Sequence, residues 1–122
     1  MIWMAVLVGG ALGSAARHAV NMSAERWLGK PGPLSTATVN MIGSLVIGLL
    51  AGAIAARRLT MTTTVRAFVF VGILGGFTTF SSFMLDSLTL LEGGAPGHAA
   101  LNLVGQLVLG FMLVYVGYRL IA

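Results

Sequence analysis

The sequence predicts an all-α integral membrane protein, a single domain (residues 1–122) of four transmembrane helices, the third of them broken in mid-membrane. Hydrophobic residues make up 57% of the chain and charged residues only 8%, whereas about 25% of the residues of a water-soluble domain are charged. The mean hydropathy is +0.97. Because so few charges cannot cover a surface in water, most of this surface must face lipid. In a bacterial cell we expect a multi-pass protein of the inner membrane.

Four apolar stretches are long enough to cross a bilayer, which takes about 20 predominantly apolar residues. They are residues 2–20, 37–56, 65–85 and 99–121. The connecting segments are polar, basic or rich in glycine and proline. No basic segment precedes the first stretch, which favours a spanning helix over a cleaved signal peptide.

Three of the spans carry glycine pairs four residues apart, which place both glycines on one helix face. Such pairs allow helix backbones to approach closely in lipid, and they are Gly9 and Gly13, Gly48 and Gly52, and Gly72 and Gly76. Arg17 lies near the predicted end of the first span. It either attracts anions at a vestibule or extends its charge to the membrane interface.

Asn40 lies in the first turn or so of the second span, where an apolar residue would be less costly. Its amide can donate two hydrogen bonds to an anion, and a polar side chain inside a span is a candidate functional residue. The alternative is a hydrogen bond to a neighbouring helix that only stabilises packing.

The third span contains residues 72–83, in which two adjacent glycines are followed by two threonines and two serines. These residues weaken a helix, and a break is tolerated in a bilayer only inside protein or beside a polar cavity. Carbonyl oxygens freed by such a break, at Gly75 and Thr78, can hold a small cation between two copies. The alternative is a continuous helix whose Ser and Thr side chains bond to the preceding turn.

Phe80 and Phe83 follow this segment and, at a spacing of three residues, share a helix face. The edges of aromatic rings are electropositive, so ring edges facing a narrow passage can accompany a dehydrated anion. Packing alone explains the same spacing.

The basic residues fall almost evenly on the two predicted sides of the membrane. One side has four and the other three: Arg57, Arg58, Arg66 and Arg119 against Arg17, Arg26 and Lys30. A difference of one does not fix the direction of insertion. Either the chain inserts both ways and two inverted copies pair, or it has one topology with a weak bias. Because four short helices enclose little space alone, we expect an oligomer.

Several functions are excluded by composition. The basic residues stand singly rather than in the clustered stripe that nucleic acid requires. There is no cysteine, so disulfides and thiolate metal sites are absent. His18 and His98 are isolated and no catalytic arrangement is apparent, so we expect no enzyme.

Three segments together resemble the CrcB/Fluc family of fluoride ion channels: residues 9–17 (GGALGSAAR), 36–40 (TATVN) and 75–83 (GGFTTFSSF). The resemblance covers all four spans, and the third segment is its most specific part. It implies an antiparallel, dual-topology homodimer in lipid with two fluoride pores. It also implies a structural sodium ion, which is not transported, on the dimer axis.

The resemblance further implies roles for individual residues. The sodium ion corresponds to the backbone carbonyls of Gly75 and Thr78. Pore residues are implied at several positions: Arg17 in the vestibule, Asn40, Phe80 and Phe83 in the pore, and Thr36, Thr79 and Ser82 as hydroxyls lining the path.

The sequence departs from the family pattern at two places. Ser35-Thr36-Ala37 replaces a usual Gly-Thr-Leu, and Gln106 and Gly110 stand in the fourth span where hydroxyl residues are common. Gln106 either supplies an amide donor to the path or makes a hydrogen bond of packing only.

Under the channel interpretation, fluoride leaves the cell passively, exchanging water for donors and ring edges. One rival is a small multidrug-resistance-type exporter, which needs a carboxylate within the membrane. The acids Glu25, Asp86 and Glu92 are all predicted at span ends or in loops, with Asp86 capping or extending to the interface at the end of the third span. A second rival is a non-transporting membrane assembly subunit, for which glycine packing suffices.

Overall fold

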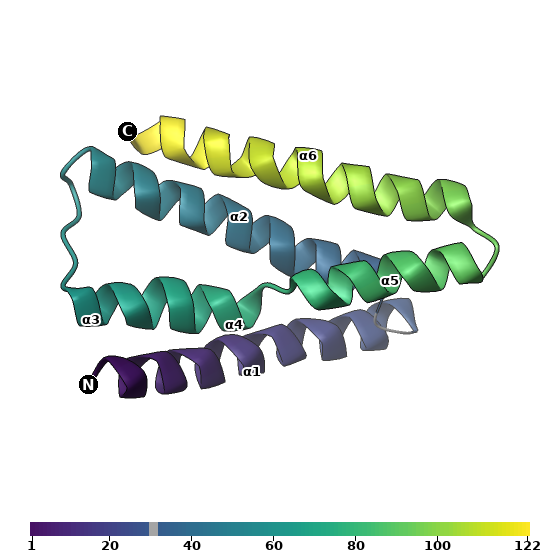
Figure 1. The fold of residues 1–122 in the computed structure, drawn as a ribbon, viewed down its shortest axis with the longest axis horizontal. Coiled ribbons are helices and arrows are strands. Elements are labelled where there is room, and N and C mark those ends of the chain that lie inside the picture. The colour runs from purple at the N-terminus through teal and green to yellow at the C-terminus, as the bar shows by residue number, and fades with distance from the viewer. Residues whose placement is uncertain (30–31) are drawn as a thin grey trace.

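The computed structural model describes residues 1–29 and 32–122, and its regular structure is helical throughout those residues. The helices are α1 (Ile2–Leu28), α2 (Pro33–Ala55), α3 (Thr63–Arg66), the π-helix η1 (Ala67–Leu74), α4 (Gly75–Phe77), α5 (Phe80–Glu92) and α6 (Pro96–Ile121). The segment from α3 to α5 forms one long rod with an interruption near its middle (Figure 1).

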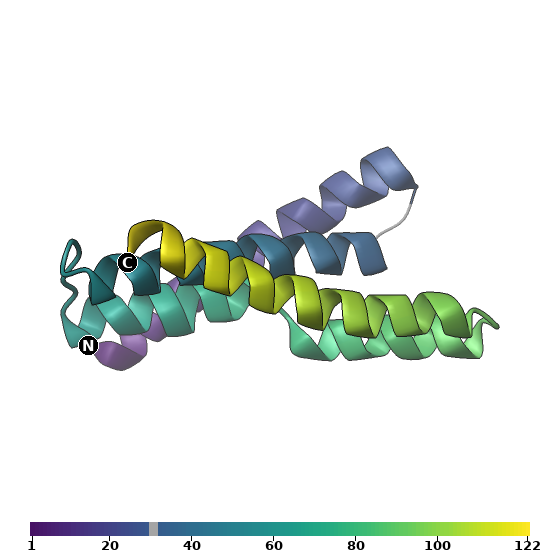
Figure 2. The ribbon, with the colours of Figure 1, turned by 90° about the horizontal axis from the view of Figure 1, so that it is seen from above.

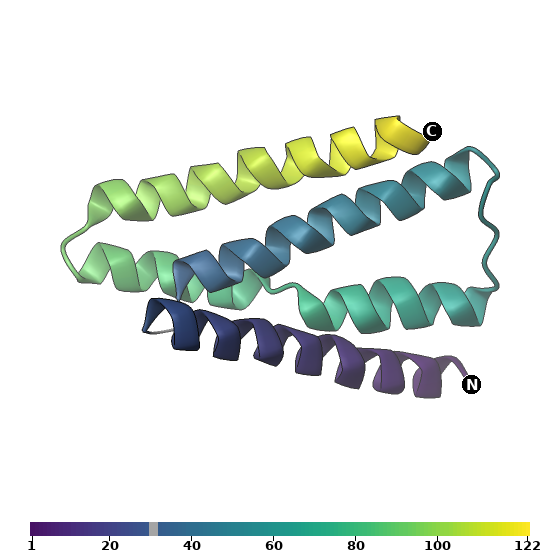
Figure 3. The same cartoon turned by 180° about the vertical axis from the view of Figure 1, so that it is seen from behind.

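The rods run side by side and alternate in direction. Helix α2 packs along α6, α1 packs along η1 and α4, and α5 packs on α6. Both chain termini and the loop after α2 lie at the same end of the molecule, as Figure 3 shows from behind. Arg57, Arg58, Arg66 and Arg119 were predicted to share one side of the membrane on this same arrangement of the chain. The second half of α1 diverges from the other rods (Figure 2).

Three segments of the described chain are long and apolar enough to cross a membrane: Pro33–Ala55, Thr63–Glu92 and Pro96–Ile121. Helix α1 is also long, at 27 residues, but Arg17 and His18 interrupt its apolar stretch. The predicted first span is therefore present as a helix, but it is not among the three segments apolar enough to cross a membrane.

The helix ends differ from the predicted ends. Helix α1 continues through most of the predicted polar loop to Gly29, whose φ of 85° ends it. Lys30 lies outside the described residues, so its predicted side of the membrane has no structural counterpart. Helices α2 and α6 begin early, because proline at the first helical position lacks only an amide that needs no partner there.

All three glycine pairs lie at close helix contacts, as predicted. A Cβ atom at Gly9 would meet the Phe68 carbonyl oxygen at 2.5 Å, and one at Gly52 would meet the Tyr118 carbonyl oxygen at 2.5 Å. Added atoms at the other pair members would likewise meet backbone of the facing helix, at Gly13, Gly48, Gly72 and Gly76. Van der Waals contact between backbones therefore holds α1 to η1 and α2 to α6.

Candidate functional site

The third rod is broken at Thr78 and Thr79, so the alternative of a continuous helix is excluded. Both residues are extended, with φ and ψ of −83° and 161° at Thr78 and −152° and 119° at Thr79. Thr78 Oγ1 donates to the Leu74 carbonyl at 2.9 Å, and Thr79 Oγ1 accepts from the Ser82 amide at 3.2 Å. Thr78 thus terminates α4, and Thr79 is the N-cap of α5.

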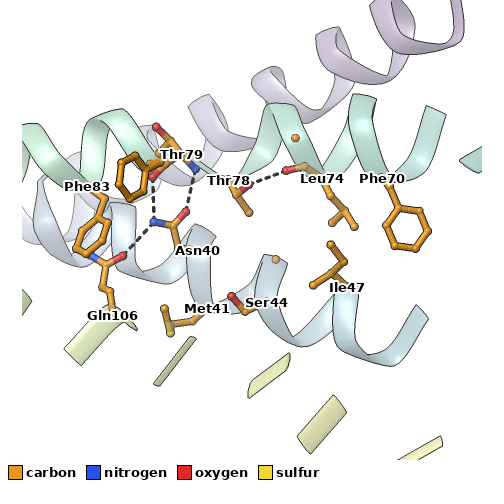
Figure 4. A pocket seen from close by; sticks show the side chains of 13 residues that line it. Asn40, Met41, Ser44, Ile47, Phe70, Leu74, Thr78, Thr79, Phe83 and Gln106 are labelled. Atoms are coloured by element: carbon orange, nitrogen blue, oxygen red, sulfur yellow. Dashed lines mark hydrogen bonds between the residues drawn. The ribbon is translucent and has the colours of Figure 1, made fainter. Parts of the chain in front are cut away.

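Asn40 of α2 holds this break from the side. Its Oδ1 accepts from the Thr79 amide at 2.9 Å, and its Nδ2 donates to the Thr79 carbonyl at 3.1 Å (Figure 4). Nδ2 also donates to Gln106 Oε1 at 3.0 Å. Asn40 lies in the third turn of α2 rather than the first, because the helix starts at Pro33. The side chain therefore sits at the depth of the break.

The break releases the carbonyl oxygens of Gly75 and Thr78, among others, from helical pairing. In a continuous helix the Thr79 amide would donate to Gly75 and the Ser82 amide to Thr78. Here Thr79 donates to Asn40 and Ser82 donates to the Thr79 side chain. These two carbonyls belong to the residues that the sequence indicated as cation ligands. No group of three His, Cys, Asp or Glu side chains is placed to hold a metal within residues 1–29 and 32–122.

A cavity of about 450 Å³ opens beside the break between α2, the third rod and α6. Its lining includes Asn40, Thr79, Phe80, Phe83 and Gln106. Figure 4 shows the Asn40 and Gln106 amides and the Phe83 ring close to Thr79. The cavity therefore brings polar donors and aromatic rings from three helices to one place.

The two phenylalanines meet edge to face, with ring centroids 6.1 Å apart and planes at 79°. Their exposure differs sharply, since Phe83 is 4% exposed and Phe80 is 70% exposed in the single chain. They line one cavity, as their predicted common face requires, but only Phe83 is enclosed by its own chain. Phe80 presents its ring outward.

A second, polar pocket of about 300 Å³ lies on the other side of Thr79. Arg17, Thr36, Thr79 and Ser82 all line it, together with Ser14, His18, Asn21 and Val39. Arg17 was predicted near the end of the first span, and it stands 11 residues before the end of the longer helix α1. Its guanidinium-bearing side chain shares a pocket with the break instead. Thr79 lines both pockets and is the point where they adjoin.

Thr36 lines the polar pocket, but its hydroxyl already has an acceptor. Its Oγ1 donates to Asp86 Oδ2 at 2.7 Å, so its hydrogen is already used. Asp86 lies within α5, which extends to Glu92, so the predicted role in capping the end of this helix is wrong. A helix that runs seven residues past the predicted end of the third span brings the carboxylate alongside α2.

The two departures in the fourth span both face α2. Gln106 is 7% exposed and bonds to Asn40, while Gly110 is buried near Met41 and Ser44. Asn102 and Ser87, which the sequence did not single out, extend the same network. The sequence could have indicated part of this network, because Asn102 and Gln106 are four residues apart and therefore share one face of an otherwise apolar helix.

Comparison with known proteins supports a common origin over nearly the whole chain. A family model described as "CrcB-like protein, Camphor Resistance (CrcB)" matches residues 4–118. A protein of Nitrobacter hamburgensis named "Fluoride-specific ion channel FluC 2" is 44% identical over 121 residues, 99% of this chain and 97% of the relative.

Two further relatives, each named "Fluoride-specific ion channel FluC", are equally similar. The protein of Methylobacillus flagellatus is 44% identical over 119 residues, 97% of this chain and 92% of the relative. That of Thermus thermophilus is 43% identical over 123 residues, covering 97% of this chain and 91% of the relative. The similarity therefore includes the break and both pockets.

Proposed function

The chain belongs to the CrcB family, and from this premise we propose that it is a fluoride-selective channel through which fluoride leaves the cytoplasm passively. Matching relatives are named as ion channels, so the family is not one of enzymes. The observation that carries the proposal is the helix break at Thr79, held by Asn40 between a polar pocket and an aromatic-lined cavity.

The two pockets supply a path with donors at each step. Arg17 attracts an anion to the polar pocket, and the Thr79 and Ser82 hydroxyls replace part of its water. Beyond Thr79, the cavity offers the Asn40 amide and the electropositive edges of Phe80 and Phe83. In one chain this cavity is open, so a second copy that covers its open side would narrow the path and favour a small anion over a larger halide.

One argument against the exporter is weakened, because Asp86 lies inside a helix rather than at a span end or in a loop. Its carboxylate, however, accepts a hydrogen bond from Thr36, and the matching relatives are named as channels. The assembly-subunit rival gives no account of the clamped break.

Fluoride efflux from liposomes tests the proposal. Vesicles that contain the purified protein, are loaded with potassium fluoride and are treated with a potassium ionophore to carry the balancing charge are expected to release fluoride to an external electrode. Vesicles loaded with potassium chloride under the same conditions are expected to release none. Empty vesicles are the control. Release of neither halide supports the assembly subunit, and equal release of both contradicts selectivity.

An inverted homodimer is part of the proposal, because one chain leaves the cavity and the Phe80 ring open. The natural chain has no cysteine, so single cysteines report contacts cleanly. In two inverted copies that meet at their breaks, Gly75→Cys is expected to form a disulfide-linked dimer. A Cβ there meets only the Phe70 carbonyl oxygen at 3.6 Å, so the substitution is accommodated.

Gly97→Cys is the matched control for this experiment. Gly97 lies at the start of α6, far from the break, and a Cβ there meets nothing within 4 Å. Inverted copies place their Gly97 residues on opposite sides of the membrane. Cross-linking through residue 97 and not through residue 75 would indicate parallel copies.

A sodium ion between the two copies completes the proposal. The Gly75 and Thr78 carbonyls are hard oxygen ligands of the kind that coordinate alkali cations in channel filters. Gly75 is exposed in the single chain and Thr78 is half-buried, so a second copy can bring its own pair to the same point. The positive charge of the ion would hold together the carbonyl oxygens that the two helix breaks expose. We expect the dimer to melt at a higher temperature in sodium than in N-methylglucamine, and equal melting temperatures would exclude such a site.

A further inference from the structure

Four side chains form a continuous hydrogen-bonded series that leads away from the break. Asn40 Nδ2 donates to Gln106 Oε1 at 3.0 Å, and Gln106 Nε2 donates to Asn102 Oδ1 at 2.8 Å. Asn102 Nδ2 then donates to Ser87 Oγ at 2.9 Å, which donates to the Phe83 carbonyl at 2.9 Å. We call these four side chains the amide series. It joins α2, α6 and α5.

Counting donors shows that Asn40 has none to spare. A carboxamide carries two N–H donors, and those of Asn40 are used by the Thr79 carbonyl and Gln106 Oε1. An anion can therefore bind the Asn40 amide only by displacing one acceptor. The Thr79 backbone is held by two reciprocal bonds, whereas Gln106 Oε1 is held by one. Gln106 is the acceptor that gives way.

We propose that the Gln106 carboxamide is an anion-binding group that turns over when fluoride enters the cavity; this inference rests on the proposed function and deepens it. A half turn about the last side-chain bond exchanges Oε1 and Nε2. Gln106 and Asn40 then present two N–H donors to the same point in the cavity that both line. The acceptor of the empty site becomes a donor of the occupied one.

The rest of the amide series can follow this change without leaving a buried group unpaired. After the turn, Gln106 Oε1 faces Asn102, whose own half turn presents Nδ2 to it. Asn102 Oδ1 then accepts from the Ser87 hydroxyl. The Gln106–Asn102 and Asn102–Ser87 hydrogen bonds are thereby reversed in polarity, while the Ser87 hydroxyl gives up its bond to the Phe83 carbonyl. That carbonyl keeps its helical partner, the Ser87 amide, so the change suits a residue as buried as Gln106, at 7% exposure.

The turnover also favours a small ion. Two N–H donors on side chains already within hydrogen-bond distance of each other can converge on fluoride at short donor–anion distances. A larger halide would need the α2 and α6 side chains to separate, and close backbone contacts at Gly48 and Gly52 hold these helices together. Gln106 is thus a residue that determines ion specificity.

Because Gln106 is the only glutamine of the chain, labelling glutamine with nitrogen-15 at its side-chain amide gives one resonance to follow. In detergent-solubilised protein, sodium fluoride is expected to shift this resonance in a saturable way, while sodium chloride at the same concentration leaves it in place. A resonance that fluoride does not move, in protein that conducts fluoride, overturns the proposal.

Two near-isosteric variants of Gln106 test the proposal by their rates of fluoride efflux. Gln106→Glu keeps an acceptor but loses the N–H donors, and Gln106→Met loses both. Each is expected to slow fluoride efflux by at least tenfold, while Val104→Met, on an exposed part of the same helix, conducts as the wild type does. If Gln106→Met conducts as fast as the wild type or faster, the glutamine only competes for Asn40 and the proposal fails.

The proposed channel function and the proposed role of Gln106 are contradicted by different results. Absence of fluoride efflux from the wild type contradicts the proposed function itself. Wild-type efflux combined with an unmoved glutamine resonance contradicts only the role of Gln106. Should the variants not fold, the titration of the labelled wild type decides the matter alone.

Discussion

Replacing Asn40 by aspartate is expected to slow fluoride efflux by about 100-fold or more. Aspartate keeps the acceptor for the Thr79 amide but loses both N–H donors, which reach the Thr79 carbonyl and Gln106. Losing two hydrogen bonds near a charge removes about 3 kcal/mol, or about 100-fold in rate. The added negative charge repels an anion as well. Efflux is measured from liposomes containing equal amounts of dimeric protein.

Thr38→Asp is the control for this variant. Thr38 lies two residues away on the exposed side of α2 and lines neither the cavity nor the polar pocket. It adds the same charge to the same helix. Equal efflux from the two variants would remove Asn40 from the path.

Replacing Phe80 by isoleucine is the second change with a large expected effect. Isoleucine preserves an apolar side chain but has no electropositive ring edge. Edge-on contacts governed by the ring quadrupole contribute up to about 1.5 kcal/mol, or about tenfold in rate, and fluoride efflux is expected to fall by at least that factor. The dimer should persist in size-exclusion chromatography, because only one side chain is shortened.

Phe111→Ile offers a matched comparison. Phe111 on α6 is 74% exposed, close to the 70% of Phe80, but it does not line the cavity beside the break. The same chemical change there should leave efflux intact. If both variants conduct as the wild type does, the rings serve packing only.

Much of the fold follows from local sequence. The apolar stretches predicted the helices, and the glycine pairs predicted their closest contacts, because both signals depend on residues within a few positions of one another. The break was also indicated locally, by glycines followed by threonines at residues 75–79. An N-cap threonine and an extended neighbour then realise it.

The site was less predictable, because its hydrogen bonds join distant parts of the chain. Asn40 and Gln106 are 66 residues apart in sequence, and Thr36 and Asp86 are 50 apart. No periodicity reports which acceptor a side chain will find. The sequence therefore indicated Thr36 as a hydroxyl lining the path, but it did not indicate that this hydroxyl donates to Asp86.

The length of α1 was misjudged for a local reason. The polar second half of α1 has a helical sequence without an apolar pattern, so hydropathy placed the helix end near Val20 and the structure places it at Leu28. That extension moves Arg17 from the predicted end of a span to the level of the break. A local misjudgement thus changed the interpretation of a site residue.

The most direct test is the reversal potential of the current across a planar bilayer containing the purified protein. With fluoride at different concentrations on the two sides, and chloride and pH equal, the current should reverse at the equilibrium potential of fluoride. Imposing a pH gradient should not move that value. Reversal that follows the proton or chloride gradient, or the absence of any current, would contradict a passive fluoride path at the helix break.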